Sequence, residues 1–261
     1  MKTVYVGVDA GGTNIKLYTK TCKQIITSSS IARREEFVCI VEKFIKESGI
    51  AFETVKVGIA YTGIGNKEQI FDSGKAFLKG LDKTAFKHFP VVFINDANAV
   101  AYAAKSDFPN SKCLLAITNG TGLGSGIIIG NQIFEGANGI AGSIHGFQVG
   151  TPDNIISVGE VCSGSAIKGE IEKGDYPEEA IVRKAAEYLG MCINSIIKIF
   201  NPDHIVFSGG AFKYEGYYET MVSFIQRTCS ERYRIGLEMH LAEDLLYNGA
   251  IGALRYAQND N

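Results

Sequence analysis

The sequence lacks paired cysteines and any run of basic residues. Its six cysteines are scattered with no Cys-x-x-Cys pair: Cys22, Cys39, Cys113, Cys162, Cys192 and Cys229. This spacing favours reduced thiols over a disulfide framework or a cysteine zinc site. The formal net charge is −2, whereas a nucleic-acid surface needs a cationic footprint. We therefore expect no nucleic-acid partner.

We also expect no signal peptide and no membrane-spanning segment. Its start enters a strand interrupted by Asp9, which is not a signal-peptide pattern. Residues 113–134 carry no charge, but the Thr-Asn-Gly-Thr-Gly at 118–122 favours a strand–turn–strand over a membrane helix. Hydrophobic residues make up 46% and charged residues 21%, a balance typical of soluble globular proteins. We expect a cytoplasmic protein with no membrane partner.

The most informative segment is a glycine-rich turn near the start. Residues 4–18 are typical of two strands of β-branched and aromatic residues, joined by a tight turn that carries Asp9, Gly11, Gly12 and Thr13. Adjacent glycines let backbone N–H groups approach and cradle an anion. Asp9 could hold Mg²⁺ directly or through water, since hard cations take oxygen ligands. The alternative is a plain hairpin with a capping Asp.

The next segments predict an α/β lobe. A third strand over 23–30 is followed by a helix that ends at Gly49, a strand over 55–61 and a loop over 62–66. A short helix over 81–88 is stopped by Pro90, and a buried strand follows over 91–94. This order of strands and helices predicts a largely covered sheet.

An Asn-Asp-Ala-Asn-Ala motif follows that strand at 95–99. Asn95 or Asp96 is a natural N-cap for a helix running to about Lys105, and capping alone could explain the motif. However, Asp96 follows a parallel-type strand at its carboxyl end, where open α/β sheets bind ligands. Two asparagines also flank it, which is more than one cap requires. We therefore expect Asp96 to be functional.

The second half opens on the same plan as the first. Strands over 114–118 and 125–130 flank the turn at 119–124, which is rich in glycine and threonine. Two lobes with one phosphate-sized turn each predict a nucleotide in the cleft between them. The glycines alternate and enter a strand, which excludes the dinucleotide-binding fingerprint, and no P-loop motif is present.

The rest of the chain completes the second lobe. A small-residue run at 136–146 contains Asn138 and His145, and the long helix after Pro177 has a core stripe that ends at Phe200. Strands are expected over 204–207 and 235–241, a turn over 208–211 and a closing helix over 245–257. We predict an N-terminal lobe over 1–108, a C-terminal lobe over 109–244, and a helix over 245–258 that packs back on the first lobe.

Together these motifs resemble the ROK family of bacterial sugar kinases, within the actin-like ATPase superfamily. The motifs that match in order are residues 9–13, 95–99, 120–126, 136–142 and 201–203 with 208–210. The resemblance spans residues 4–256. It implies an α/β fold of the two-lobed, actin-like ATPase (ribonuclease H-like) type, with ATP and sugar in the cleft between the lobes.

The resemblance also implies a role for each motif. Asp96 would be the general base toward the attacking sugar hydroxyl, and Asp9 would hold Mg²⁺, directly or through water. The residues expected at ATP and its phosphates are Asp9, Gly11, Gly12, Thr13, Lys16, Gly120, Thr121, Gly122, Gly209 and Gly210. Those expected at the sugar are Thr62, Gly63, Asn95, Asp96, Asn138, His145 and Glu160.

The sugar half departs from the family pattern. The family usually has Ala-Gly-Glu-Ile-Gly-His where residues 141–146 have Ser143 in place of the Glu and the His displaced by one, at His145. Glu160 lies three residues before Ser163 instead of four, and the segment at 77–81 lacks the usual Asn and Trp. The cysteine-rich zinc segment is missing, so we expect no structural zinc. The sugar need not be glucose.

We therefore expect an ATP-dependent sugar kinase for a hexose or N-acetylhexosamine, with a homodimer implied by the family alone. One alternative is a kinase of the same superfamily with another small-molecule substrate, for example pantothenate. Another is a catalytically silent sugar sensor.

Overall fold

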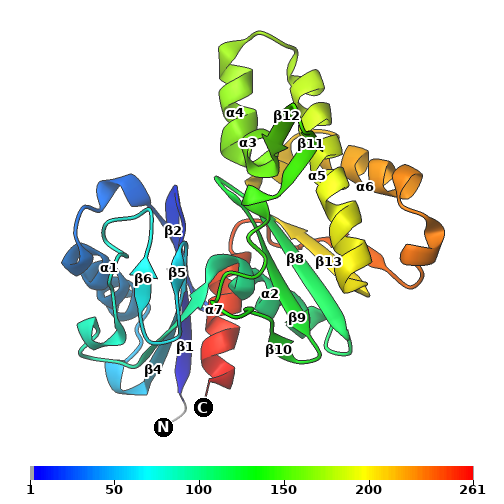
Figure 1. Ribbon diagram of the computed structural model, residues 1–261. Coiled ribbons are helices and arrows are strands. Elements are labelled where there is room, and N and C mark those ends of the chain that lie inside the picture. Colours follow the sequence, from blue (N-terminus) through cyan, green and yellow to red (C-terminus); the bar gives the residue numbers. More distant parts are fainter. Residues whose placement is uncertain (1–2, 261) are drawn as a thin grey trace. The chain divides into compact units, whose positions relative to one another are not determined.

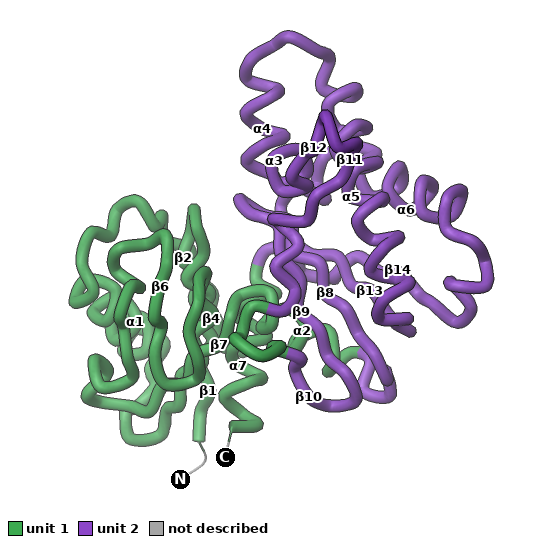
Figure 2. The backbone as a smooth tube through the Cα atoms, in the orientation of Figure 1, with its two compact units in different colours: residues 1–107, 135–140, 247–261 green, residues 108–134, 141–246 purple. Residues whose placement is uncertain are grey.

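The computed structural model describes residues 3–260 and divides into two compact units (Figures 1 and 2). Unit 1 comprises residues up to Asp107 together with Glu135–Ile140 and the segment from Tyr247 onward, and unit 2 comprises Phe108–Phe134 and Ala141–Leu246. The segment Glu135–Ile140, placed in the second lobe by the sequence prediction, thus groups with unit 1. Within residues 3–260, no helix has the length and apolar character needed to cross a membrane.

Unit 1 is built on a five-stranded sheet in the order β3-β2-β1-β4-β7. Its strands are β1 (Val4–Ala10), β2 (Asn14–Tyr18), β3 (Lys23–Thr27), β4 (Val55–Tyr61) and β7 (Val91–Asn95). The chain also forms β5 (Ile64–Gly65), β6 (Ile70–Asp72), α1 (Arg34–Glu47), α2 (Asp96–Asp107) and α7 (Asn248–Asn259). β1 to β3 form an antiparallel meander, whereas β1, β4 and β7 are parallel.

The two faces of this sheet pack differently because side chains alternate along a strand. Val8 and Ile59 face α1 and form a buried cluster with Phe37 and other α1 residues. On the opposite face Gly7 and Gly58, which are partners in register, lie under α7. A Cβ on Gly7 would come within 1.9 Å of the Ala250 carbonyl oxygen, so α7 rests directly on the sheet backbone.

One predicted helix is wrong. The helix expected over 81–88 is only a 3-10 turn at Lys83–Ala85. The preceding backbone is already paired, since Ile70 N–H donates to the Leu81 carbonyl and Gly80 N–H to the Ile70 carbonyl. Because the residues before 83 pair with β6 and Pro90 follows soon after, a longer helix cannot form here.

Unit 2 is built on a second five-stranded sheet, in the order β10-β9-β8-β13-β14. Its strands are β8 (Cys113–Asn119), β9 (Leu123–Ile129), β10 (Gln132–Ile133), β13 (His204–Ser208) and β14 (Glu238–Leu241), with a separate hairpin of β11 (Gln148–Thr151) and β12 (Asn154–Ser157). Its helices are α3 (Val158–Cys162), α4 (Gly164–Lys173), α5 (Glu178–Phe200) and α6 (Tyr217–Thr228). The core stripe predicted on α5 is confirmed, since Ile181, Leu189 and Ile193 are buried against Ile205 and Phe207 of β13.

Candidate active site

The carboxyl ends of three parallel strands meet at one edge of the unit 1 sheet. Ala10 of β1 is in register with Tyr61 of β4, and Tyr61 is in register with Asn95 of β7. Asp9, Thr62 and Asp96 therefore lie at the same edge. This is the edge at which open α/β sheets bind ligands.

Asp9 is a buried carboxylate with a cationic partner. Lys16 lies opposite it in the β1–β2 register, and Lys16 Nζ donates to Asp9 Oδ2 at 2.8 Å. The first turn of α7 also packs on Asp9, since a Cβ on Gly249 would come within 2.9 Å of the carboxyl carbon. The positive end of a helix and an ammonium group thus both face this carboxylate and offset the cost of its burial.

The glycine turn after β1 is braced by a residue that the sequence did not single out. Gly11 N–H donates to the Asn14 carbonyl at 3.1 Å, which closes the turn. Ser28 Oγ donates to the Gly11 carbonyl at 2.8 Å, and Ser28 N–H donates to the Thr13 carbonyl at 2.8 Å. Ser28 comes from the start of a serine run just after β3, and only the β2–β3 pairing brings it here.

Asn95 caps α2, which was one of the two roles open from the sequence. Its Oδ1 accepts from the N–H groups of Ala97 at 3.0 Å and Asn98 at 3.4 Å, and its Nδ2 donates to the Gly63 carbonyl at 3.4 Å. Asp96 is the first residue of the helix, and its Oδ1 accepts from Ala97 N–H at 2.9 Å. Asn95 thus fixes where Asp96 stands.

Asp96 has the most functionally suggestive pKa in this site. Burial, and then the negative charge of Asp9, raise the pKa of Asp96 to about 7, against a smaller opposing effect of backbone N–H groups and Lys16. A carboxylate with a pKa near neutrality accepts protons far better than an ordinary aspartate. The arrangement therefore supplies a base at the strand edge, beside a second carboxylate and an ammonium group.

Thr62, Gly63 and Asn138 complete the unit 1 group. The Thr62 carbonyl accepts from Ser73 Oγ at 2.6 Å, and Gly63 adopts a φ of +128° with its α-carbon close to the backbone of Asp72. Asn138 is exposed on the segment that joins this unit, next to Gly139, which approaches the Gly65 carbonyl. A side chain at position 63 would be strained in that backbone conformation.

In unit 2, the second glycine turn lies next to Gly209 and Gly210. Thr118 of β8 and Ser208 of β13 are in register, so the turns that follow them are neighbours. Gly209 has a φ of +113°, and a Cβ there would lie 2.4 Å from the Asn119 carbonyl oxygen. The predicted residues Gly120, Thr121, Gly122, Gly209 and Gly210 therefore form one group.

Asn119 organises this group, and the sequence prediction missed it. Its fully buried side chain donates from Nδ2 to the Cys162 carbonyl at 2.7 Å and to Tyr217 Oη at 3.0 Å. Its Oδ1 accepts from Gly164 N–H at 3.1 Å. Its partners lie 43 to 98 residues away in the sequence, so no local pattern could indicate them.

His145 lies against the start of α3, the short helix that carries Glu160. The His145 imidazole lies against the backbone of Gly159, where a Cβ would come within 2.0 Å of Nδ1, and Glu160 is the next residue. Both side chains are exposed. The other end of α3 is Cys162, whose carbonyl accepts from Asn119, so one short helix connects the expected sugar residues of unit 2 to its glycine turns.

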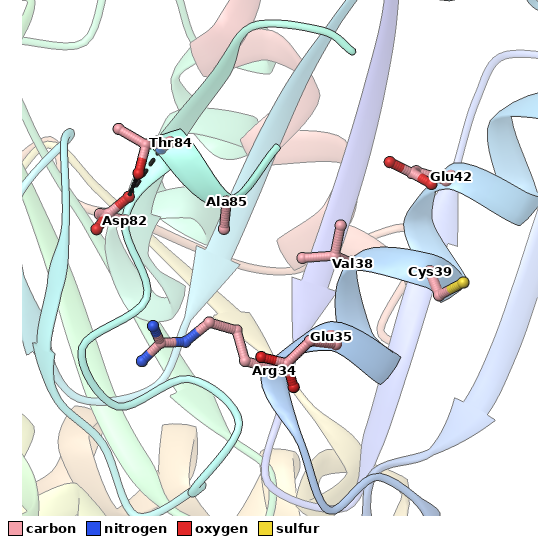
Figure 3. Close-up of a pocket in the computed structure, with 8 residues that line it drawn as sticks. All are labelled: Arg34, Glu35, Val38, Cys39, Glu42, Asp82, Thr84 and Ala85. Atoms are coloured by element: carbon pink, nitrogen blue, oxygen red, sulfur yellow. Dashed lines mark hydrogen bonds between the residues drawn. The ribbon is translucent and has the colours of Figure 1, made fainter. Parts of the chain in front are cut away.

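A hollow elsewhere on unit 1 contains none of the predicted site residues (Figure 3). It has a volume of about 370 Å³. It is lined by Arg34, Glu35, Val38, Cys39, Glu42, Asp82, Thr84 and Ala85. Arg34 donates to the Lys79 carbonyl at 2.8 Å, so its guanidinium fastens a loop.

Comparisons with known proteins agree with the motifs. The sequence model described as "ROK family" matches residues 5–155 and 145–260. The chain is 26% identical over 268 residues to the glucokinase of Halalkalibacterium halodurans, covering 80% of this chain and 81% of that protein.

Solved structures show the same fold over nearly the whole chain. A ROK family protein from Streptococcus pneumoniae in complex with sucrose matches with a TM-score of 0.82 and 17% identity, covering 99% of each chain. A ROK family glucokinase from Streptomyces griseus in complex with glucose and AMPPNP matches with a TM-score of 0.72 and 21% identity, covering 98% of this chain and 99% of that one. The predicted α/β, actin-like fold is thereby confirmed.

Proposed function

The chain belongs to the ROK family, and on that premise we propose that it is an ATP-dependent sugar kinase. The reaction transfers the γ-phosphoryl group of ATP to a hydroxyl of a hexose or N-acetylhexosamine. The observation that carries the proposal is Asp96, a carboxylate at the end of β7 whose pKa is raised to about 7. Sugar kinases need a base of this kind and little other covalent chemistry.

Asp96 acts in this proposal as the general base. The sugar hydroxyl oxygen forms a bond to the γ-phosphorus, the bond from that phosphorus to the bridging oxygen breaks, and ADP leaves. The hydroxyl proton passes to the Asp96 carboxylate. A base whose pKa lies near the working pH is partly ionised and can still hold the proton it takes.

The phosphates are assigned to the glycine turns. We propose that backbone N–H groups of Gly11 and Gly12, with Thr13, and those of Gly120 and Gly122, with Thr121, bind phosphate oxygens. Lys16 neutralises charge beside them. Gly209 and Gly210 are assigned to the adenosine side, since without side chains they leave the backbone open to a flat ligand.

Asp9 fits a magnesium ion held through water. Its carboxylate offers the oxygen ligands that Mg²⁺ prefers, and Lys16 Nζ already occupies Oδ2. When bound, Mg²⁺ neutralises negative charge on the phosphates during transfer. The buried position of Asp9 holds this ligand in one orientation.

The sugar is assigned to the polar groups around Asp96 and at the start of α3. These are Thr62, Gly63, Asn95, Asn138, His145 and Glu160. Asn95 is the most constrained of them, because its Oδ1 caps α2 and one N–H of Nδ2 donates to the Gly63 carbonyl, which leaves the second N–H of Nδ2 for a sugar hydroxyl. Ser143 stands where the family usually has a glutamate, so one strong hydrogen-bond acceptor is lost. This loss supports a sugar other than glucose.

The test is a coupled ADP-release assay with Mg²⁺-ATP over a panel of acceptors. The panel contains glucose, fructose, mannose, N-acetylglucosamine, N-acetylmannosamine, allose and pantothenate. We expect strong turnover with one sugar. Turnover with pantothenate alone would favour the other superfamily kinase, and sugar binding without ADP release would favour a silent sensor; either result would contradict the proposal.

A further inference from the structure

Two histidines and a glutamate gather on one face of the unit 2 sheet. His204 begins β13, and Glu238 and His240 alternate along β14, the edge strand beside it (Figure 2). The parallel register pairs His204 with Glu238 and Val206 with His240. Since side chains alternate, all three polar residues share the face opposite Ile205 and Phe207, which belong to the core of the unit.

The three side chains bring ligand atoms close together. One atom from each of His204, Glu238 and His240 can be chosen so that all lie within 4.8 Å of one another. His240 Nε2 lies 3.3 Å from Glu238 Oε2. A tetrahedral site with bonds of about 2.0–2.2 Å needs ligand atoms about 3.4 Å apart, so small side-chain rotations are sufficient.

Two buried imidazole nitrogens in this cluster make no hydrogen bond within the described part of the chain. Among residues 3–260, neither His204 Nδ1 nor His240 Nε2 makes a hydrogen bond, although both atoms are buried; the Glu238 oxygen 3.3 Å from His240 Nε2 lies within ion-pair distance but without hydrogen-bond geometry. Buried polar atoms are nearly always satisfied, so two such nitrogens in one cluster call for a ligand. Each is also an atom that can coordinate a metal ion once it is unprotonated.

An aromatic ring fixes the orientation of both imidazoles. Phe108 stacks on His204 with ring centroids 4.3 Å apart and on His240 at 4.7 Å, with interplanar angles of 24° and 29°. This stacking limits rotation of the rings, so less freedom is lost when a ligand binds. Ligand side chains held in place by their surroundings are typical of built metal sites.

We propose that His204, Glu238 and His240 bind a divalent transition-metal ion, with Zn²⁺ as the expected occupant. Two imidazoles and one carboxylate form a ligand set that suits Zn²⁺ and leaves its fourth position to water. The ion links the edge strand β14 to β13 and so stabilises this side of the sheet. The expectation of no structural zinc rested on the cysteines, and this site uses none of them.

The site is distinct from the residues proposed for catalysis. His204 and Glu238 are the first residues of β13 and β14, with His240 two residues further along, whereas Gly209 and Gly210 follow the carboxyl end of β13. Its test is metal binding and does not depend on turnover. Failure of the metal proposal therefore leaves the kinase proposal untouched, and the reverse also holds.

The experiment is a calorimetric titration of the full chain with Zn²⁺, after a chelator has removed bound metal. Excess Mg²⁺ without nucleotide is present, so that Asp9 and Asp96 do not compete for Zn²⁺. We expect one Zn²⁺ per chain and a melting temperature that rises with Zn²⁺. Co²⁺ in place of Zn²⁺ should give the visible absorption of a tetrahedral site.

Three ligand variants and one matched control decide the assignment. His204→Gln, His240→Gln and Glu238→Gln should each weaken Zn²⁺ binding at least ~10-fold, since even the residues that support metal ligands contribute that much. Glu238 is 63% exposed, so its replacement leaves the fold intact. His88→Gln, which removes an exposed histidine stacked on Phe52, should bind as the wild type does. Absence of stoichiometric binding, or binding retained by the ligand variants, would overturn the proposal.

Discussion

Asp9 and Asp96 are coupled across the strand edge of unit 1: the negative charge of Asp9 is, after burial, the main cause that raises the pKa of Asp96. Asp9 lies near the carboxyl end of β1 and Asp96 directly follows β7, and these strands flank β4. Asp9 has Lys16 as its ion partner, whereas among residues 3–260 Asp96 has no ion partner, and its charged form is favoured only by backbone N–H groups and a small effect of Lys16. The different surroundings of the two acids thus favour different roles: Asp9 stays charged beside the phosphates, and Asp96 serves as the base.

The raised pKa of Asp96 makes folding stability depend on pH. Asp96 has a pKa near 7 in the folded protein and about 3.9 when unfolded, so between these values the folded state binds more protons. The contribution of Asp96 to the free energy of unfolding therefore becomes less favourable as pH rises from about 4 to 7, and it stays unfavourable above pH 7. Asp96→Asn removes this penalty and should stabilise the protein at pH 8 by about 1–4 kcal/mol.

Thermal unfolding at pH 4 and pH 8 checks this prediction. The two proteins should melt alike at pH 4, and the variant should melt several degrees higher at pH 8. Asp153→Asn, which replaces an exposed carboxylate in the β11–β12 turn, should show no such divergence. Equal melting of Asp96→Asn and wild type at both pH values would contradict the assigned pKa.

Asp9 and Lys16 should move the pH profile of the reaction in opposite directions. The acid limb of kcat/KM should follow Asp96, with activity lost as pH falls through about 7. Asp9→Asn removes a charge that raises this pKa, so the limb should shift to lower pH, together with a higher Mg²⁺ requirement. Lys16→Gln removes a charge that lowers it, so the limb should shift to higher pH. Shifts in the same direction, or a limb that neither variant moves, would refute the coupling.

Two glycine-to-alanine substitutions should change the free energy of unfolding in opposite directions, one at the contact of α2 with α7 and one in open space on α4. A Cβ on Gly252 would lie 1.7 Å from the Ala99 carbonyl oxygen, so Gly252→Ala must push the two helices apart. We expect a loss of about 2 kcal/mol or more in the free energy of unfolding. Gly169→Ala, in α4 with no neighbour within 4 Å, should instead gain about 0.5–1 kcal/mol. Urea unfolding measures both, and a tolerated Gly252→Ala would show that α7 does not pack as described.

Asn119 should matter to the nucleotide although it is buried beneath the turns. Asn119→Ala removes the three buried hydrogen bonds to Cys162, Tyr217 and Gly164, at a cost of about 1–3 kcal/mol, and should weaken ATP binding. Tyr217→Phe is the matched control, because it removes the hydroxyl and keeps the bonds from Asn119 to Cys162 and Gly164. Calorimetric titration with ATP should show a much smaller effect in the control. Unchanged ATP affinity in Asn119→Ala would remove Asn119 from the support of these turns.

Much of unit 1 could be predicted because its signals are local. A strand pattern followed by Gly11, Gly12 and Thr13, or by Asn95 and Asp96, places polar groups at strand ends without knowledge of distant contacts. Ser28 and Asn119 could not be predicted, because each acts through partners that only sheet pairing and helix packing bring near. The false helix at 81–88 has the same cause, since β6 pairs with backbone that local propensity would make helical.

The measurement that tests the central claim most directly is ADP release by Asp96→Asn, compared with wild type at saturating Mg²⁺-ATP and the best sugar. ATP affinity is measured on the same preparations. The account predicts a fall in kcat of ~10²–10⁴-fold, the usual contribution of a positioned base, with ATP affinity near that of wild type. A variant that keeps its kcat would contradict the role of Asp96 as the base.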